Sequence, residues 1–349
     1  MRVLIVDDSV VTRMLLRAVL EAEGYQVKEA SNGEQALQIL LVYTPDIVTM
    51  DVHMPGLDGY ETTARILERY ALPVVVVTAS ADPYASATAM RALEAGALAV
   101  LEKPSGLGAP DFSERIDELL RTLRSMSQVK IVRRLRKAGE PMRQQSALQL
   151  SGLASSRPQL VAIAASAGGP VAIKSILQAL SAQQPWALVL VQHIAPGFLQ
   201  SFCEWLATFA PGPVAVAVDG QTLVPGTLYL APEGLHLGFS ANRSVLFDDG
   251  PLEEYVRPSA DYLFRSVARQ FGKQAIGIQL SGMGKDGAKG MLELSRTGAL
   301  TIAQEPSTAV VDSMPLAAIE QRAIGKVLPP EGIAALLNAL AAQSVSQDA

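Results

Sequence analysis

Cysteine is nearly absent from this chain: one residue, Cys203, occurs among 349. An internal disulfide is therefore excluded, and such sparse cysteine is typical of proteins in a reducing cytoplasm. Cys203 lies in a helical pattern beside Phe202 and Trp205, which favours a buried packing role over chemistry. Histidine is almost as scarce, with three residues, so a site that needs an imidazole has few positions to use.

Long apolar runs are also missing. Those present, such as residues 73–77, are far shorter than the roughly 20 residues that span a bilayer as a helix. Acidic residues follow the first apolar residues directly, at Asp7 and Asp8, where a secretory signal would need an apolar core. We therefore expect a cytoplasmic protein without membrane insertion.

The chain also lacks an excess of basic residues. The formal net charge is −5, so nothing in the overall charge indicates binding to nucleic acid. Hydrophobic residues make up 49% of the chain and charged residues 18%, which predicts folded cores rather than disorder. A chain of this length is expected to form about two domains.

Strand and helix patterns alternate through the first part of the chain. Five β-rich apolar runs are each followed by a helical pattern, which predicts a (βα)5 domain: a flavodoxin-like, doubly wound parallel sheet. The predicted strands are residues 3–6, 26–30, 47–50, 74–77 and 98–101, and the predicted helices are residues 9–22, 33–41, 59–70, 84–95 and 112–124.

Polar residues stand at the carboxyl ends of four of these strands, where ligands bind in such sheets. They are Asp7, Asp8, Asp51, Thr78 and Lys103. Three carboxylates in one pocket repel one another unless a divalent cation is held there, and hard oxygen ligands suit Mg²⁺. The lysine and threonine could hold the oxygens of a phosphoryl group. A single acid at a strand end usually caps a helix, but the whole set is hard to obtain by chance.

The motifs VDDS, DVHMPGLDG, VTAS and EKP carry a resemblance over residues 1–122. This segment resembles the response-regulator receiver family, and we place that domain at residues 1–124. The resemblance implies that Asp51 accepts a phosphoryl group, that Asp7, Asp8 and Asp51 hold Mg²⁺, and that Thr78 and Lys103 contact the phosphoryl oxygens. One departure is Val100, which stands where receivers often carry an aromatic switch residue. His53 is expected to be a variable loop position.

Residues 125–158 differ in composition. From residue 128 to 158 there are seven basic residues and one acid, with Ser, Gln, Gly and Pro filling the second half. This composition predicts a solvated basic linker. The alternative is a docking stripe for an acidic partner helix.

The rest of the chain again alternates strands and helices. We expect a second doubly wound α/β domain at residues 159–343, followed by a disordered tail at 344–349. Short strands at 214–218, 227–231 and 236–239, separated by Gly and Pro turns, predict an antiparallel edge hairpin. The remaining predicted strands are residues 160–165, 187–191, 274–280 and 299–303, and the predicted helices are 198–209, 259–271, 288–296 and 315–321.

Ser166 follows an apolar strand and precedes small residues and Pro170, at which a helical pattern begins. This order places the serine on a sharp strand-to-helix turn, where helix N–H groups favour a developing negative charge. His193 and Asp286 also follow predicted strands, so the three can share one sheet edge. They match the roles of nucleophile, general base and orienting acid in acyl transfer. Alternatively, Ser166 only caps the helix.

Two further patterns, a glycine motif and a third histidine, could indicate other functional sites. Gly282, Gly284 and Gly287 form a G-x-G-x-x-G after a predicted strand, with Glu305 18 residues beyond the last glycine, which is the layout of a dinucleotide site. Against it, Asp286 would place like charge beside a pyrophosphate. His236 lies in an apolar run, where a satisfied core histidine is the usual outcome.

Six stretches carry a second resemblance: AASAGGP, LVQHIAPGF, YLAPEGLHL, RPSADYLF, LSGMGKDGAKG and AQEPSTAVVDSMP. Residues 160–342 resemble the catalytic domain of the chemotaxis protein-glutamate methylesterases, the CheB family. The resemblance implies Ser166, His193 and Asp286 as a catalytic triad, with the backbone N–H groups of Met283 and Ala167 stabilising an oxyanion.

Two departures from that family bear on the site. Ala167 replaces a common threonine, which removes a hydroxyl that could help to orient the histidine. Asp312 and Ser313 replace a more usual hydrophobic-glycine pair, which bears on the rim of the site or on substrate preference.

Together the resemblances imply a phosphorylation-activated serine hydrolase that needs Mg²⁺ in the receiver and no cofactor at the esterase site. It would demethylate glutamate γ-methyl esters on the cytoplasmic helices of chemoreceptors, releasing methanol, and deamidate specific glutamines, releasing ammonia. The chemotaxis histidine kinase would be the phosphoryl donor, and the unphosphorylated receiver would cover the Ser166 face. A transcription factor and a catalytically inactive adaptor are the alternatives.

Overall fold

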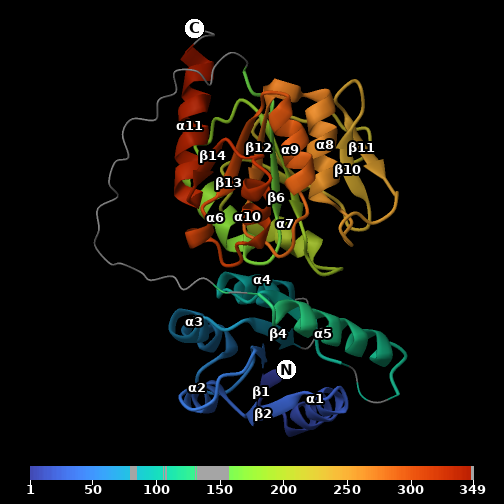
Figure 1. Ribbon diagram of the computed structural model, residues 1–349, viewed down its shortest axis with the longest axis vertical. Coiled ribbons are helices and arrows are strands. Elements are labelled where there is room, and N and C mark those ends of the chain that lie inside the picture. Colours follow the sequence, from blue (N-terminus) through green and yellow to red (C-terminus); the bar gives the residue numbers. More distant parts are fainter. Residues whose placement is uncertain (79–84, 105, 107, 130, 132–156, 347–349) are drawn as a thin grey trace, which may run out of the picture. The chain divides into compact units, whose positions relative to one another are not determined.

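A computed structural model describes residues 1–78, 85–104, 106, 108–129, 131 and 157–346 (Figure 1). The chain divides into two compact units, residues 1–133 and 134–349. The predicted fourth helix begins outside the described residues, at Tyr84. Linker residues 132–156 and tail residues 347–349 also lie outside them, so the domain bounds given above stay predictions.

The first unit is built on one parallel sheet in the strand order β2-β1-β3-β4-β5. This confirms the flavodoxin-like prediction. The central strands β3 and β4 are buried at every residue, as apolar strands covered on both faces must be. The strands are β1 (Arg2–Val6), β2 (Gln26–Ala30), β3 (Ile47–Met50), β4 (Val74–Thr78) and β5 (Ala99–Glu102).

The helices of this unit begin where the sequence supplies a cap. The side chains of Ser9, Asn32 and Asp58 each accept a hydrogen bond from a backbone N–H three residues on, which satisfies one otherwise unpaired donor. Buried apolar side chains of the first and last helices complete the core beneath the sheet. The helices are α1 (Val10–Ala22), α2 (Gly33–Leu40), α3 (Gly59–Tyr70), α4 (Ala85–Glu94) and α5 (Phe112–Met126).

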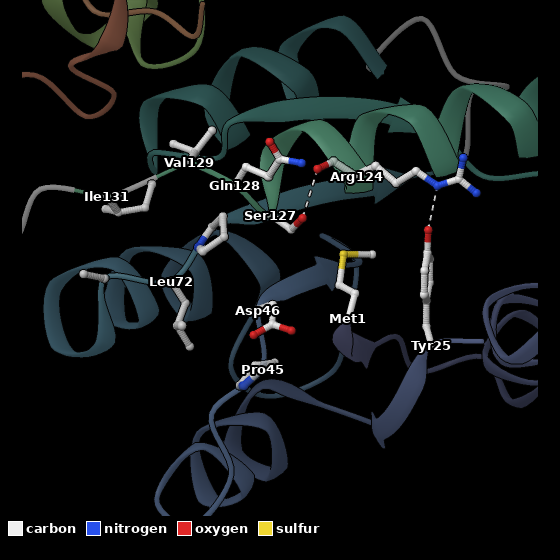
Figure 2. A pocket seen from close by; sticks show the side chains of 12 residues that line it. Met1, Tyr25, Pro45, Asp46, Leu72, Arg124, Ser127, Gln128, Val129 and Ile131 are labelled. Carbon is white, nitrogen blue, oxygen red and sulfur yellow. Dashed lines mark hydrogen bonds between the residues drawn. The ribbon is translucent and has the colours of Figure 1, made fainter. Parts of the chain in front are cut away.

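A pocket of about 830 Å³ lies at the amino ends of the strands of this unit. Figure 2 shows Met1 and Asp46, which precede β1 and β3, on its wall, and the guanidinium of Arg124 bonded to the hydroxyl of Tyr25 at 2.7 Å. Asp51 lies at the opposite, carboxyl edge of the sheet, directly after β3. The pocket therefore takes no part in the acidic site described below.

The second unit contains a seven-stranded sheet in the order β14-β13-β12-β6-β7-β9-β8, and every neighbouring pair is parallel. Strands β6, β7 and β12 are buried at every residue. The strands are β6 (Leu160–Ala165), β7 (Ala187–Gln192), β8 (Val214–Val216), β9 (Leu228–Leu230), β12 (Ala275–Gln279), β13 (Leu300–Gln304) and β14 (Lys326–Leu328).

The predicted doubly wound α/β domain with an antiparallel hairpin is confirmed, but the hairpin was expected among residues 214–218, 227–231 and 236–239, and that pairing is wrong. Strands β8 and β9 run parallel, because residues 217–227 are long enough to return the chain to the same end of the sheet. The antiparallel pair is β10 (His236–Phe239) with β11 (Val245–Asp248), and it forms a separate two-stranded sheet. Strands β11 and β14 were not predicted from the sequence.

Helices of the second unit cover its sheets and pack on one another. Helices α8 and α9 lie side by side, and α11 packs against α6 (Figure 1). The last helix, α11, was not predicted, and none of the described helices is long and apolar enough to cross a membrane. The helices are α6 (Gly169–Ala179), α7 (Leu199–Ala207), α8 (Ala260–Gln270), α9 (Ala288–Arg296), α10 (Ser313–Glu320) and α11 (Pro330–Ser346), with short 3-10 turns at Gly272–Gln274 and Pro306–Thr308.

Candidate functional site

Three adjacent strands bring Ser166, His193 and Asp286 to one edge of the second sheet. Strand β6 lies between β12 and β7, and Ser166 and His193 directly follow β6 and β7. Backbone bonds fix these ends: the N–H of His193 donates to the carbonyl of Ala165, and the N–H of Ser166 donates to that of Ser281, both at 3.0 Å. Asp286 lies in the loop that follows β12.

The histidine and the aspartate are joined directly. The Nε2 atom of His193 lies 3.0 Å from Oδ2 of Asp286, which is 3% exposed. With Nε2 occupied, Nδ1 is the ring nitrogen available to the serine. No described hydrogen bond joins the Ser166 hydroxyl to His193, and such bonds often tighten only when substrate binds.

The amino end of α8 surrounds the carboxylate of Asp286. Oδ1 accepts bonds from the Ser259 hydroxyl at 2.8 Å and from the N–H of Asp261 at 3.0 Å, and Oδ2 accepts one from the N–H of Ala260 at 2.7 Å. Burial alone raises the pKa of this carboxyl, but the bond and charge of His193 and the two backbone donors lower it below its usual value. The aspartate is therefore held ionised, facing the histidine.

His236 supports this arrangement from behind. Its Nδ1 accepts a bond from the N–H of Ser259 at 3.1 Å, and its Nε2 donates to the carbonyl of Pro251 at 2.9 Å. The ring is 1% exposed and stacks on Tyr262, with ring centroids 4.8 Å apart. The prediction of a satisfied core histidine is confirmed. One acceptor and one donor define a neutral imidazole that fixes the position of Ser259.

Ser166 does not cap α6. The capping residue is Gly168, with φ of 74°, and no side chain bonds to the helix start. The alternative that Ser166 serves only as a cap is therefore wrong. No described hydrogen bond uses the N–H of Ala167, the residue after the serine, so this donor remains available to a ligand.

The loop after β12 packs directly against the serine. A Cβ atom on Gly282 would lie 2.8 Å from the Cβ of Ser166 and 2.1 Å from the sulfur of Met314, so only glycine fits. The next residue, Met283, has an N–H that takes part in no described hydrogen bond. Met283 is the neighbour of Gly282, which packs on Ser166, so a second backbone donor lies one residue from that contact.

Two serines hold this region together: Ser281, which no sequence pattern indicated, and Ser313, which was noted only as a departure at the rim of the site. The Ser281 hydroxyl donates to the carbonyl of Ala167 at 2.8 Å and accepts from the N–H of Val311 at 3.0 Å. The Ser313 hydroxyl donates to the carbonyl of Gly282 at 3.0 Å and accepts from the N–H of Gly284 at 3.1 Å. Both flanks of Met283 are thereby fixed. The only sequence signal for Ser313 is its position next to Asp312 in the departure noted above.

This geometry is unfavourable for a dinucleotide. The carboxylate of Asp286 is committed to His193 and α8, and Gly282 packs on Ser166 rather than facing open space. Close contacts account for Gly282 and Gly287, and the positive φ of 94° accounts for Gly284.

The first unit gathers its acidic residues at the carboxyl edge of its own sheet. Asp7, Asp8 and Asp51 place one oxygen each within 4.8 Å of one another. The ammonium of Lys103 lies 2.8 Å from Asp7 and 2.7 Å from Asp51. Burial raises the pKa of the Asp7 carboxyl, while the hydrogen bond from Lys103 opposes this. A hard divalent cation such as Mg²⁺ suits this oxygen cluster.

Thr78 adds an unpaired hydroxyl to the same edge. Thr78 is 3% exposed, and its Oγ1 has no hydrogen-bond partner among the described residues. A buried hydroxyl without a partner is unfavourable unless a ligand satisfies it, so the site fits a phosphoryl group beside Asp51. Val100 is buried within β5, and the exposed His53 contributes only its backbone N–H to Asp51, at 3.5 Å.

Two family models match the chain: the response regulator receiver domain over residues 3–116 and CheB methylesterase over residues 161–337. A "Protein-glutamate methylesterase/protein-glutamine glutaminase 3" from Hahella chejuensis is 47% identical over 99% of this chain and 99% of its own length. A similarly named relative from Syntrophus aciditrophicus is 43% identical over 97% of this chain and 98% of its own. The CheB methylesterase catalytic domain of Thermotoga maritima matches in structure with a TM-score of 0.51 and 35% identity, over 52% of this chain and 98% of that one.

A receiver fold with an acidic cluster, joined to a second α/β unit with a serine, a histidine and an aspartate at one edge, defines a response regulator with an enzymatic output domain. The chain belongs to the CheB family of protein-glutamate methylesterases, as similarity over nearly its whole length shows. The resemblance inferred from the sequence is confirmed, and the transcription-factor and dinucleotide alternatives are set aside.

Proposed function

We propose that this protein is a phosphorylation-activated hydrolase that removes methyl groups from glutamate γ-methyl esters on chemoreceptors. The observation that carries the proposal is the bond between His193 and Asp286 beside Ser166, in a chain similar to named methylesterases over 99% of its length. The same site would convert specific glutamines to glutamates, because an amide passes through the same acyl-enzyme.

The reaction begins with attack of the Ser166 hydroxyl oxygen on the ester carbonyl, while Nδ1 of His193 takes the hydroxyl proton. Asp286 stabilises the imidazolium that forms. The N–H groups of Met283 and Ala167 donate to the oxyanion of the tetrahedral intermediate. When that intermediate collapses, His193 returns the proton to the departing methoxide, and methanol leaves an acyl-Ser166. Water, deprotonated by His193, then releases the glutamate and restores the serine.

The first unit supplies the regulation in this proposal. Asp51 accepts a phosphoryl group from a histidine kinase, and Lys103 and Thr78 hold its oxygens. Asp7, Asp8 and Asp51 would hold Mg²⁺, which neutralises charge during the transfer. Phosphorylation then raises the rate at Ser166.

The test is methanol release from methylated receptor membranes, with and without a small phosphoryl donor and Mg²⁺. We expect wild type to release methanol and the donor to stimulate release several-fold. Asp51→Ala should keep the basal rate and lose the stimulation. Absence of release from wild type, with receptors shown to be methylated, would favour the adaptor and contradict the proposal.

The contacts of Ser313 lead to a second prediction. Ser313→Ala removes the hydroxyl that fixes both flanks of Met283, so we expect its N–H to move from the oxyanion position. Small misplacements of this kind lower kcat by about tenfold or more, and KM should change little. Methanol release at several substrate concentrations measures both constants.

Ser313→Thr, which retains the hydroxyl, should restore most of the rate. Ser307→Ala is the matched control, because Ser307 is exposed in the 3-10 turn that precedes α10. A kcat of Ser313→Ala equal to that of wild type would show that the hydroxyl does not position the loop.

A further inference from the structure

A short hairpin, residues 253–256, lies beside the pocket that contains His193. The pocket has a volume of about 300 Å³, and Leu252, Tyr255 and Val256 line it together with the histidine. A substrate side chain that enters this pocket to reach His193 therefore lies beside this hairpin.

The hairpin is held in a strained form. Its turn residues, Glu254 and Tyr255, have φ of 47° and 67°, a left-handed conformation that such turns usually assign to asparagine and glycine. Glu253 and Val256 exchange both backbone hydrogen bonds, at 3.2 and 2.9 Å. Strained backbone of this kind persists only where the surroundings enforce it, and it is common at functional sites.

Ion pairs with two helices hold the turn in this conformation. Both carboxylate oxygens of Glu253 bond to the guanidinium of Arg265 on α8, at 2.8 and 2.5 Å. The carboxylate of Glu254 pairs with Lys289 on α9 at 2.5 Å. Helices α8 and α9, which pack side by side (Figure 1), therefore each hold one residue of the hairpin through an ion pair.

The side chains presented by this rigid turn are apolar and open to solvent. Tyr255 is 93% exposed and Leu252 is 59% exposed. An exposed aromatic residue on a fixed backbone offers a large contact area with little loss of conformational entropy. Nothing in the core of the described unit requires Tyr255 to be a tyrosine.

We propose that this hairpin grips the polypeptide of the substrate protein, with Tyr255 packing on apolar side chains of the helical segment that carries the esterified glutamate. The inference rests on the proposed function. The pocket is large enough for a side chain but not for a helix, so the substrate backbone stays outside, at the level of the rim. A glutamyl side chain then reaches inward, and residues one turn away on its helix face Tyr255.

The experiment compares two substrates: methylated receptor membranes and a small activated ester such as phenyl acetate. For Tyr255→Ala we expect KM for the receptor to rise about tenfold with kcat unchanged, and hydrolysis of the small ester to equal that of wild type. Tyr255→Phe, which keeps the ring, should resemble wild type. Val224→Ala is the matched control, because Val224 is 56% exposed and does not line the pocket.

The outcomes separate the inference from the proposed function. An unchanged receptor KM in Tyr255→Ala, with wild type active, would overturn the inference alone. Equal losses on both substrates would also overturn it, since they would show that the hairpin supports His193. Wild type that hydrolyses the small ester but releases no methanol from receptors would overturn both proposals.

Discussion

Asp286→Asn is expected to lower kcat for methanol release by roughly 10⁴-fold while leaving the protein folded. The amide oxygen at the Oδ1 position can still accept the bonds from the Ser259 hydroxyl and the N–H of Asp261. The bond from the N–H of Ala260 to Oδ2 is lost, and no charge remains to stabilise the imidazolium of His193. The side-chain NH₂ group of asparagine then donates to Nε2 of His193. This favours the tautomer that carries its proton on Nδ1, which cannot accept the proton of Ser166. Methanol release measures the effect, and circular dichroism checks the fold.

The matched control for this prediction is Asp261→Asn. Asp261 is also buried, lies in the first turn of α8, and accepts a bond from the N–H of Gly290 at 2.7 Å rather than from His193. We expect its kcat to stay near that of wild type. A loss in Asp261→Asn as large as in Asp286→Asn would show that the helix start, and not the charge facing His193, governs the rate.

Asp261 also has a pH signature of its own. Burial, aided by the charge of Asp286, raises the pKa of its carboxyl to about 6. The folded protein thus binds this proton more tightly than the unfolded chain does. The contribution of Asp261 to stability therefore falls as pH rises from about 4 to 6, and Asp261→Asn should lack that fall.

Ser166→Ala is expected to reduce methanol release to background, a loss of about 10⁴-fold or more. The variant removes the attacking oxygen and leaves the two backbone donors in place. Because Ser166 does not cap α6, the helix should form as in wild type and the melting temperature should change little. The same comparison applies to release from receptors and to hydrolysis of the small ester.

Ser281→Ala separates the nucleophile from its support. It leaves the Ser166 hydroxyl intact and removes a buried bond to the carbonyl of Ala167, so it should lower stability measurably while retaining part of the activity. Full activity in Ser166→Ala would contradict acyl transfer at this serine.

The common position of Ser166, His193 and Asp286 could be predicted from the sequence, because the carboxyl ends of parallel strands lie at one edge of a sheet. The same rule located Asp7, Asp51 and the other residues of the acidic cluster. In both units the rule needs only the order of the apolar runs and the polar residues in the segment that follows each run. Their individual catalytic and binding roles stay predictions until the variants above are measured.

The supporting residues were beyond that reasoning. Ser259 and His236 act on Asp286 through contacts between segments more than 20 residues apart, and Ser313 acts on a loop 29 residues earlier. No local pattern encodes such pairs. The parallel pairing of β8 and β9 was missed for a related reason, since short strands with Gly and Pro between them fit a hairpin equally well until the length of the connection is weighed.

The position of β6 has a consequence for how the enzyme can be controlled. This strand is buried at every residue and has a parallel neighbour on each side, so its amide protons should be among the slowest to exchange with solvent. Ser166 thus directly follows a rigid strand of its unit, so regulation by displacement of the serine is unfavourable. Regulation that leaves this strand in place would act on the access of substrate to Ser166.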